Sequence, residues 1–323
     1  MERFLWELHI LRLDISLRPH RYYMSSAHRA SLLKTLTFHE TWGHAPTAAE
    51  WMMTLESDSS VDPKEARNEI EVMQREGLVV ERLGRFIFPE SVSLIDEMRH
   101  NELFAPRKRR TAGRVAAWLA RLGGVRFVAL CNTTALGHAR DESDLDFFVI
   151  TRAGTLMQTR ALATLPFKLA GRRPGHDDER DAVCLSYFVS DDGLDLSSHM
   201  LGPDDPYFRY WFLSLVPLYD DGVSRELWKA NRTMTTRHPC AMPWEVPPDF
   251  QILTPSVRIP FVRALENIAR TVQTRAFPAS IREFMNRDTR VIVNEKALKF
   301  HVTDGRDDYR RRYNEALRQR AIV

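Results

Sequence analysis

The stretch that decides the fold is VRFVALCNTTALGHARDESDLDFFVIT, residues 125–151. It begins with an apolar run, Val125 to Leu130, that has the length and composition of a buried strand. A polar turn and a short helix are expected next, before a second apolar run that starts Asp144-Leu145-Asp146-Phe147. Because successive side chains of a strand point to opposite faces, both aspartates are expected on one face. The sequence therefore predicts two buried strands with a carboxylate pair on the second.

A carboxylate pair of this kind is typical of a metal site. Two neighbouring carboxylates repel each other unless a cation neutralises them, and Mg²⁺ binds one or two carboxylates while keeping water and substrate phosphates in its shell. We therefore predict that Asp144 and Asp146 bind Mg²⁺, with Mn²⁺ as the alternative ion. The preceding turn, Asn132-Thr133-Thr134, would offer backbone N–H groups and hydroxyls to an anion. A metal and a phosphate cradle facing one space indicate phosphoryl or nucleotidyl transfer.

These residues resemble the motif of the nucleotidyltransferase superfamily, typified by DNA polymerase beta and the minimal bacterial nucleotidyltransferases. That motif is an apolar strand, Gly-Ser, a short segment, and Asp-x-Asp inside a second apolar strand. Here Asn132-Thr133 stands at the Gly-Ser position, and Ser143-Asp144-Leu145-Asp146-Phe147 matches Ser-Asp-Ile-Asp-Leu. Segments 183–198, 205–222 and 297–306 are similar to a bacterial subgroup described only as nucleotidyltransferase domain-containing proteins, so the resemblance covers residues 100–310.

The resemblance implies an enzyme that moves a nucleoside monophosphate from an NTP to an unidentified acceptor, which could be a small molecule, an RNA or a protein, and releases pyrophosphate. Asp144 and Asp146 would then bind the metal. Residues implied in nucleotide or phosphate binding by their place in the motif or beside it are Asn132, Thr133, Thr134, Arg140, Ser143, Arg152 and Lys299. Arg306 also falls in a similar segment.

The sequence departs from the family pattern in two places. Asn132 replaces glycine, although asparagine enters the positive-φ region more readily than other non-glycine residues. Active members also carry a third carboxylate on the strand after the next helix, where this chain shows Cys184 and Ser186 on the facing positions. Asp195, flanked by two leucines, is the predicted substitute and the third catalytic residue. The alternative is a transferase fold kept for binding or regulation.

Residues 26–90 resemble a winged helix. Helix starts are predicted at Ser26, Thr47 and Pro63, and two short strands are expected around Leu83-Gly84. The third helix alternates basic and acidic residues, which is poor for binding a phosphate backbone, so DNA binding is the less favoured role. The alternative function combines these features into a non-catalytic winged-helix regulator, or a toxin–antitoxin-like protein with a degenerate nucleotidyltransferase fold. The amphipathic segment Phe4 to Leu17 is expected to pack on the protein body.

Composition limits the class of protein. The chain has 323 residues, and 46 basic against 43 acidic residues leave a net charge of only +3, which argues against a protein that coats nucleic acid. Three separated cysteines indicate neither a zinc motif nor a disulfide framework. The N-terminus lacks the apolar core of a signal peptide, and no run reaches the roughly 20 apolar residues of a membrane helix. A soluble cytoplasmic protein without a membrane partner is expected.

Arginine is unusually frequent, with 39 residues against seven lysines. Codon bias is the simplest interpretation, because the arginines are spread along the whole chain. The cluster Arg107-Lys108-Arg109-Arg110 is expected to be a solvated helix face, with nucleic-acid contact as the alternative.

The predicted fold class is α+β. We expect an N-terminal helical segment and winged-helix-like unit in residues 1–95, and a nucleotidyltransferase mixed sheet with helices in residues 96–235. A linker and a helical C-terminal region are expected in residues 236–323, with a turn from Lys296 to His301 and a helix from Asp307 to Arg320.

Overall fold

A computed structural model describes residues 26–175, 179–250, 252, 255 and 257–322. The predicted amphipathic segment Phe4 to Leu17 lies outside them. The fold is α+β, as predicted: a six-stranded mixed sheet is surrounded by helices, and a two-stranded sheet lies near the N-terminus.

The N-terminal unit contains the three helices and the hairpin predicted from the sequence. Its elements are α2 (Ser26–Thr41), α3 (Ala48–Thr54), α4 (Pro63–Arg75), β1 (Val80–Arg82) and β2 (Arg85–Ile87). Thr47 caps α3 in a reciprocal capping box with Glu50. Asp62 caps α4 ahead of Pro63. Leu83 and Gly84 both have positive φ, as a tight two-residue hairpin turn requires.

The central sheet has the order β6-β3-β4-β5-β8-β7. Its strands are β3 (Val125–Leu130), β4 (Leu145–Thr151), β5 (Val183–Ser190), β6 (Val216–Asp220), β7 (Val291–Val293) and β8 (Ala297–Phe300). Strands β4 and β5 are parallel, and the other neighbouring strands are antiparallel. The short helix α7 (Asn132–Leu136) connects β3 to β4, and α8 (Leu156–Leu169) makes the crossover from β4 to β5.

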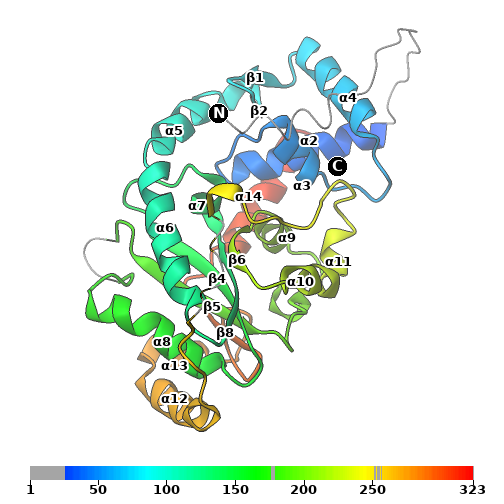
Figure 1. The fold of residues 1–323 in the computed structure, drawn as a ribbon. Helices are drawn as coiled ribbons and strands as arrows, with labels where there is room; N and C mark the ends of the chain where they lie inside the picture. The colour runs from blue at the N-terminus through cyan, green and yellow to red at the C-terminus, as the bar shows by residue number, and fades with distance from the viewer. Residues whose placement is uncertain (1–25, 176–178, 251, 253–254, 256, 323) are drawn as a thin grey trace.

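Helices cover both faces of the sheet (Figure 1). On one face, α6 (Ala105–Ala120) and α8 bury their apolar side chains against Val128, Val149 and Phe188. On the other, α9 (Pro206–Leu213), α10 (Ser224–Ala230) and α11 (Arg232–Thr235) pack on the opposite sides of the same strands. The elements before and beyond these layers are α5 (Ser93–Glu102), α12 (Arg263–Ala276), α13 (Ala279–Phe284) and α14 (Arg306–Gln319).

The C-terminal region differs from the prediction in one respect. Its helices α12, α13 and α14 are present, but the predicted turn from Lys296 to His301 is mostly strand β8. Together with β7, this strand extends the central sheet beyond β5. Besides its hairpin partner β7, strand β8 pairs with β5, which lies more than a hundred residues earlier in the chain. Local periodicity cannot reveal such a pairing in a four-residue segment.

The N-terminal unit and the sheet are joined by buried contacts. Figure 1 shows α14, near the end of the chain, returning beside α2. The Tyr309 hydroxyl donates to the Phe38 carbonyl at 2.7 Å, and the Phe38 ring stacks on Tyr210 with centroids 3.6 Å apart. His44 and His138 stack and share a hydrogen bond of 2.9 Å.

None of the helices in the described part of the chain is long and apolar enough to cross a membrane.

Buried histidines should make the protein sensitive to acid. Burial lowers the pKa of His138 to about 3 and that of His238 to about 4, and it also lowers the pKa of His39, His199 and His301. The native rings stay neutral while the unfolded chain takes up protons near pH 6.5. Above pH 6.5 these rings therefore do not lower the free energy of unfolding. As the pH falls from 6.5 toward 4, each ring lowers this free energy by up to about 1.4 kcal/mol per pH unit.

Urea unfolding at neutral pH and near pH 5.5 measures this dependence. The free energy of unfolding should fall clearly at the lower pH. In His138→Asn the slope of this free energy against pH should be smaller, because unfolding takes up about one proton fewer. Equal free energies at both pH values would contradict the prediction.

A buried ion pair links α9 to the N-terminal unit. Arg209, only 2% exposed, donates to Glu56 at 3.0 Å. We expect Arg209→Met to lower the free energy of unfolding by about 3 kcal/mol, because it leaves the Glu56 carboxylate buried beside fewer partners. Adding Glu56→Met should recover part of the loss. Arg225→Met, at an exposed site on α10, is the matched control and should cost less than about 0.5 kcal/mol.

Candidate metal and phosphate site

The site is built where β4 and β5 begin. The two strands run parallel, and Asp146 on β4 pairs with Cys184 on β5. The register then shifts, since Phe148 pairs with Tyr187, so β5 has one more residue than β4 over this interval. Such bulges redirect side chains next to functional sites. Here the shift lets Cys184 and Ser186 form a hydrogen bond of 3.3 Å with each other.

Asp144, Asp146 and Cys184 form one cluster. A carboxylate oxygen of each aspartate and the Cys184 Sγ lie within 4.8 Å of one another, and all three residues are half-buried. The predicted approach of the two aspartates is thus observed. Cys184 is one of the two β5 positions at which the resemblance to nucleotidyltransferases led us to expect a third carboxylate.

Asn132 orients one member of the cluster. Its Nδ2 donates to Asp146 Oδ2 at 2.7 Å, which holds this carboxylate in one orientation. Asn132 has φ = 56°, so it adopts the left-handed conformation for which glycine is usually required. Asparagine at this position thus keeps the turn and adds a donor to the carboxylate.

Burial places the cluster under electrostatic strain. It raises the pKa of Asp144 to about 7, and the charges of Asp146 and Glu179 add to this effect. Burial also raises the pKa of Asp146, against the hydrogen bonds that favour its charged form, and raises that of the Cys184 thiol. A divalent cation would relieve this strain, because it favours the charged form of each group. The two carboxylates fit Mg²⁺ or Mn²⁺.

Arg173 supplies positive charge beside the cluster. It lies in the loop between α8 and β5, and its Nη1 is buried without a hydrogen-bond partner among the residues that the structure describes. Burial lowers the pKa of this guanidinium, whereas Cys184 and Asp144 raise it. Arg173 was not predicted, because it lies in a loop whose sequence is typical of a polar surface segment. The available signal was a pair of arginines, Arg172-Arg173, in the loop that leads into the strand facing the aspartates.

A second polar group continues from the cluster along β5. Ser186 Oγ lies 3.1 Å from Nε2 of His301, which follows β8. Burial lowers the pKa of His301 to about 3, so the ring is neutral at ordinary pH. A line of polar side chains therefore runs from the aspartates through Cys184 and Ser186 to His301.

The predicted turn residues lie beside the cluster but have different surroundings. Thr134 is buried, and its hydroxyl donates to the Asp144 carbonyl at 3.4 Å. Thr133 is half-buried in α7, and Ser143 is half-buried immediately before Asp144. Arg140 is exposed in the loop between α7 and β4.

The basic cluster on α6 is not a simple solvated face. Lys108 is buried, and its Nζ donates to the Ser143 carbonyl at 2.6 Å and to Asp181 at 3.0 Å. Arg107 donates to the same Asp181 carboxylate. The expectation of a solvated run was wrong for Lys108, because the neighbouring loops supply acceptors that sequence spacing does not reveal.

Asp195 is not brought to the site. Asp144, Asp146 and Cys184 lie at the start of β4 and β5, whereas Asp195 follows the end of β5. It is exposed, accepts a hydrogen bond from the Ser197 amide, and lines a cavity beside the β7–β8 turn. The prediction that it completes the catalytic set was wrong. Because β4 and β5 are parallel, their starts lie side by side at one edge of the sheet, and the end of β5, which Asp195 follows, lies at the opposite edge.

Arg152 and Lys299 also have their hydrogen-bond partners away from the cluster. Arg152 follows the far end of β4, where it donates to the Gly123 carbonyl and pairs with Asp221. Lys299 is buried on β8 and donates to the Thr289 carbonyl at 2.7 Å; burial and Arg306 lower its pKa to about 7. Neither contact leads to the aspartates, so the phosphate roles expected for these two side chains are not supported by their positions.

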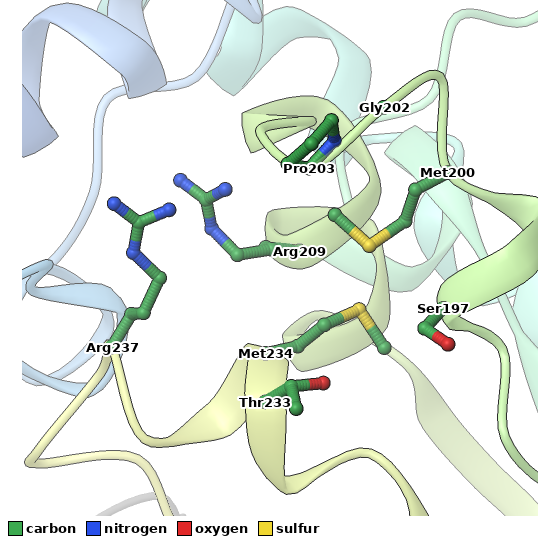
Figure 2. Close-up of a pocket in the computed structure, with 8 residues that line it drawn as sticks. All are labelled: Ser197, Met200, Gly202, Pro203, Arg209, Thr233, Met234 and Arg237. Atoms are coloured by element: carbon green, nitrogen blue, oxygen red, sulfur yellow. The ribbon is translucent and has the colours of Figure 1, made fainter.

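A separate cavity lies between the N-terminal unit and α9–α11. Figure 2 shows Arg209 and Arg237 extending side by side at one end and the two methionines, Met200 and Met234, facing each other across it. Its volume is about 300 Å³. Both arginines already contact Glu56 and Asp204, so this cavity is an ion-paired junction away from the carboxylate cluster.

Comparison with known proteins adds no assignment: no family model, no curated protein and no solved structure matches the chain.

The repulsion within the cluster predicts an effect on stability. Asp146→Asn should raise the free energy of unfolding of the metal-free protein near pH 8 by roughly 1 kcal/mol, the size of the repulsion between two unit charges about 4 Å apart in water. An amide removes the charge opposite Asp144. The gain should vanish below pH 4, where both native carboxyls are protonated. Thermal unfolding in the presence of a chelator measures it, with the exposed Asp195→Asn as the matched control. A destabilised Asp146→Asn protein at pH 8 would contradict the electrostatic interpretation.

Proposed function

We propose that the protein is a Mg²⁺-dependent nucleotidyltransferase that moves a nucleoside monophosphate from an NTP to an acceptor and releases pyrophosphate. The observation that carries this proposal is the half-buried pair formed by Asp144, immediately before β4, and Asp146 on β4, which Asn132 of the β3–α7 turn contacts. The strand, turn and Asp-x-Asp arrangement supports membership in the nucleotidyltransferase superfamily. The helices and hairpin of the N-terminal unit support a winged-helix-like description for residues before 95.

The two aspartates and two residues beside them, Asn132 and Arg173, each have a role in this proposal. Asp144 and Asp146 would hold Mg²⁺, which supplies charge neutralisation to the triphosphate oxygens when bound. Asn132 fixes the rotamer of Asp146 through its 2.7 Å hydrogen bond. Arg173 has a buried Nη1 with no hydrogen-bond partner among the described residues, and it lies beside the cluster. Of the arginines that the structure describes, it is the one we assign to binding phosphate oxygens through paired donors.

The acceptor must lose a proton in this reaction. No third carboxylate joins the cluster among the residues that the structure describes. Glu179 is the further acid whose charge acts on Asp144, and it is exposed in the loop before β5. It is the candidate proton acceptor.

Observations on α4 weigh against DNA binding as the main role. Arg29 on α2 pairs with Glu69 and Glu76 at α4, so a basic residue of the unit is neutralised. The exposed residues of α4 and its end include Lys64, Arg67 and Arg75 alongside Glu71 and Glu76. Such a mixed surface attracts a phosphate backbone only weakly.

Transfer from labelled NTPs in Mg²⁺, with small-molecule, RNA and protein acceptors, tests the proposal. Label should pass to an acceptor in the wild type and fall by at least about 100-fold in Asp144→Ala and in Asp146→Ala, because metal-bound charge neutralisation supplies most of this catalysis. Asp195→Asn and Arg152→Ala are controls of matched type and should retain activity within about twofold, since both lie at the other end of the strands.

Two results would reject the proposal. One is the absence of both NMP transfer and Mg²⁺-dependent triphosphate binding in the wild type. The other is transfer that persists when both aspartates are replaced. Loss of activity in Asp195→Asn would instead reject the position assigned to that residue.

A further inference from the structure

The third donor of the cluster is sulfur. Cys184 Sγ lies within 4.8 Å of a carboxylate oxygen of Asp144 and of Asp146, and it comes from a different strand. The three side chains converge from β4 and β5 on one small space. A divalent ion there would meet two oxygens and one thiolate.

This donor set discriminates between divalent ions. Mg²⁺ prefers an octahedral shell of oxygens and gains little from a thiolate. Zn²⁺ is bound tetrahedrally by thiolate, imidazole and carboxylate, and catalytic zinc sites commonly use three protein ligands with the fourth position open. Thiolate ligands and the general order of divalent affinities both favour Zn²⁺ over Mg²⁺.

The size of the cluster suits such an ion. Ligands at about 2.0–2.3 Å from a tetrahedral ion lie about 3.5 Å from one another. The three ligand atoms lie within 4.8 Å of one another, so a small rotation of the side chains would bring them to that spacing. Asp146 is already oriented by Asn132 Nδ2 at 2.7 Å. Cys184 is oriented by Ser186 Oγ at 3.3 Å, and Ser186 is in turn held by His301. Oriented ligands of this kind are typical of metal sites.

We propose that Asp144, Asp146 and Cys184 form a zinc-selective site, at which Zn²⁺ binds more tightly than Mg²⁺ and displaces it. Zinc at this position occupies the two carboxylates that the proposed transfer needs for magnesium. The inference shares these carboxylates with the proposed function, but it requires only metal binding and not nucleotide chemistry.

Cobalt(II) is the spectroscopic probe for the test, because it takes zinc sites and gives a thiolate-to-metal charge-transfer band in the near ultraviolet. Titration of the reduced, metal-free full chain with Co²⁺ should produce this band, and stoichiometric Zn²⁺ should abolish it, whereas millimolar Mg²⁺ should not. In Cys184→Ser the band should disappear and Zn²⁺ affinity measured by calorimetry should fall at least about tenfold. Mg²⁺ affinity should change less than about twofold.

Matched variants identify the ligand. Cys240→Ser changes a half-buried cysteine far along the chain from the cluster and should keep the band. Cys131→Ser changes the buried cysteine at the end of β3 and should also keep it. Asp146→Asn should lower the affinity of the protein for both Zn²⁺ and Mg²⁺. Circular dichroism establishes that each variant is folded before the titration.

The outcomes separate the two proposals. A band that survives in Cys184→Ser, or is lost only in Cys131→Ser, overturns the assignment of the ligand. Absence of the band in the folded wild type, with Zn²⁺ no tighter than Mg²⁺, overturns zinc selectivity. Zinc binding through Cys184, with neither NMP transfer nor Mg²⁺-dependent triphosphate binding in the zinc-free protein, would support the metal site and reject the proposed function. Mg²⁺-dependent transfer without zinc binding would do the reverse.

Discussion

The parallel pairing of β4 with β5 is the constraint on which the rest of the molecule depends. It places Asp146 beside Cys184, and thereby brings residues from two distant segments into one cluster. A parallel pair needs a long crossover connection, which α8 provides. Glu266 of α12 accepts hydrogen bonds from the Met157 and Gln158 amides at 2.8 Å each, so the free N–H groups at the start of that crossover helix are satisfied by a carboxylate.

Lys108 fixes the ends of the two strands relative to each other. Its ammonium group is buried, and a buried charge persists only when neighbouring groups compensate it. The compensating acceptors are the Ser143 carbonyl, just before β4, and Asp181, just before β5. Arg107 strengthens the Asp181 contact and lowers the pKa of this carboxyl together with Lys108, against the effect of burial. Helix α6 therefore ties together the two loops that lead into the candidate site.

The sequence was sufficient for features that local chemistry determines. Strand β3, the Asp144–Asp146 alternation and the caps at Thr47 and Asp62 depend on residues within a few positions of one another. The fold class, the hairpin and the approach of the two aspartates were predicted on that basis. The positive φ at Asn132 also agrees with the conformational preference of asparagine.

The errors share a different cause, which is long-range register. Whether Asp195 or Cys184 lies beside Asp146 depends on which end of β5 meets the start of β4, and neither residue carries that information locally. The pairing of β8 with β5 and the burial of Lys108 are equally non-local. Arg152 was assigned to phosphate because it follows the Asp-x-Asp strand, but a strand of seven residues separates its two ends by about 20 Å.

The position of the arginines clarifies why so many of them coexist with a small net charge. Arg126 bridges Asp191 and Asp221, and Arg306 contacts Asp205 and Asp304. The planar guanidinium suits these paired, partly buried contacts better than a lysine does. Arginines in such contacts are already neutralised and hold loops together. Arg173 differs, because a buried nitrogen of its guanidinium has no hydrogen-bond partner within the described part of the chain, while Asp144 and Cys184 lie close enough to act on its charge. Among the described arginines, it therefore combines positive charge, an unused donor and proximity to the carboxylates, which are the properties that triphosphate binding requires.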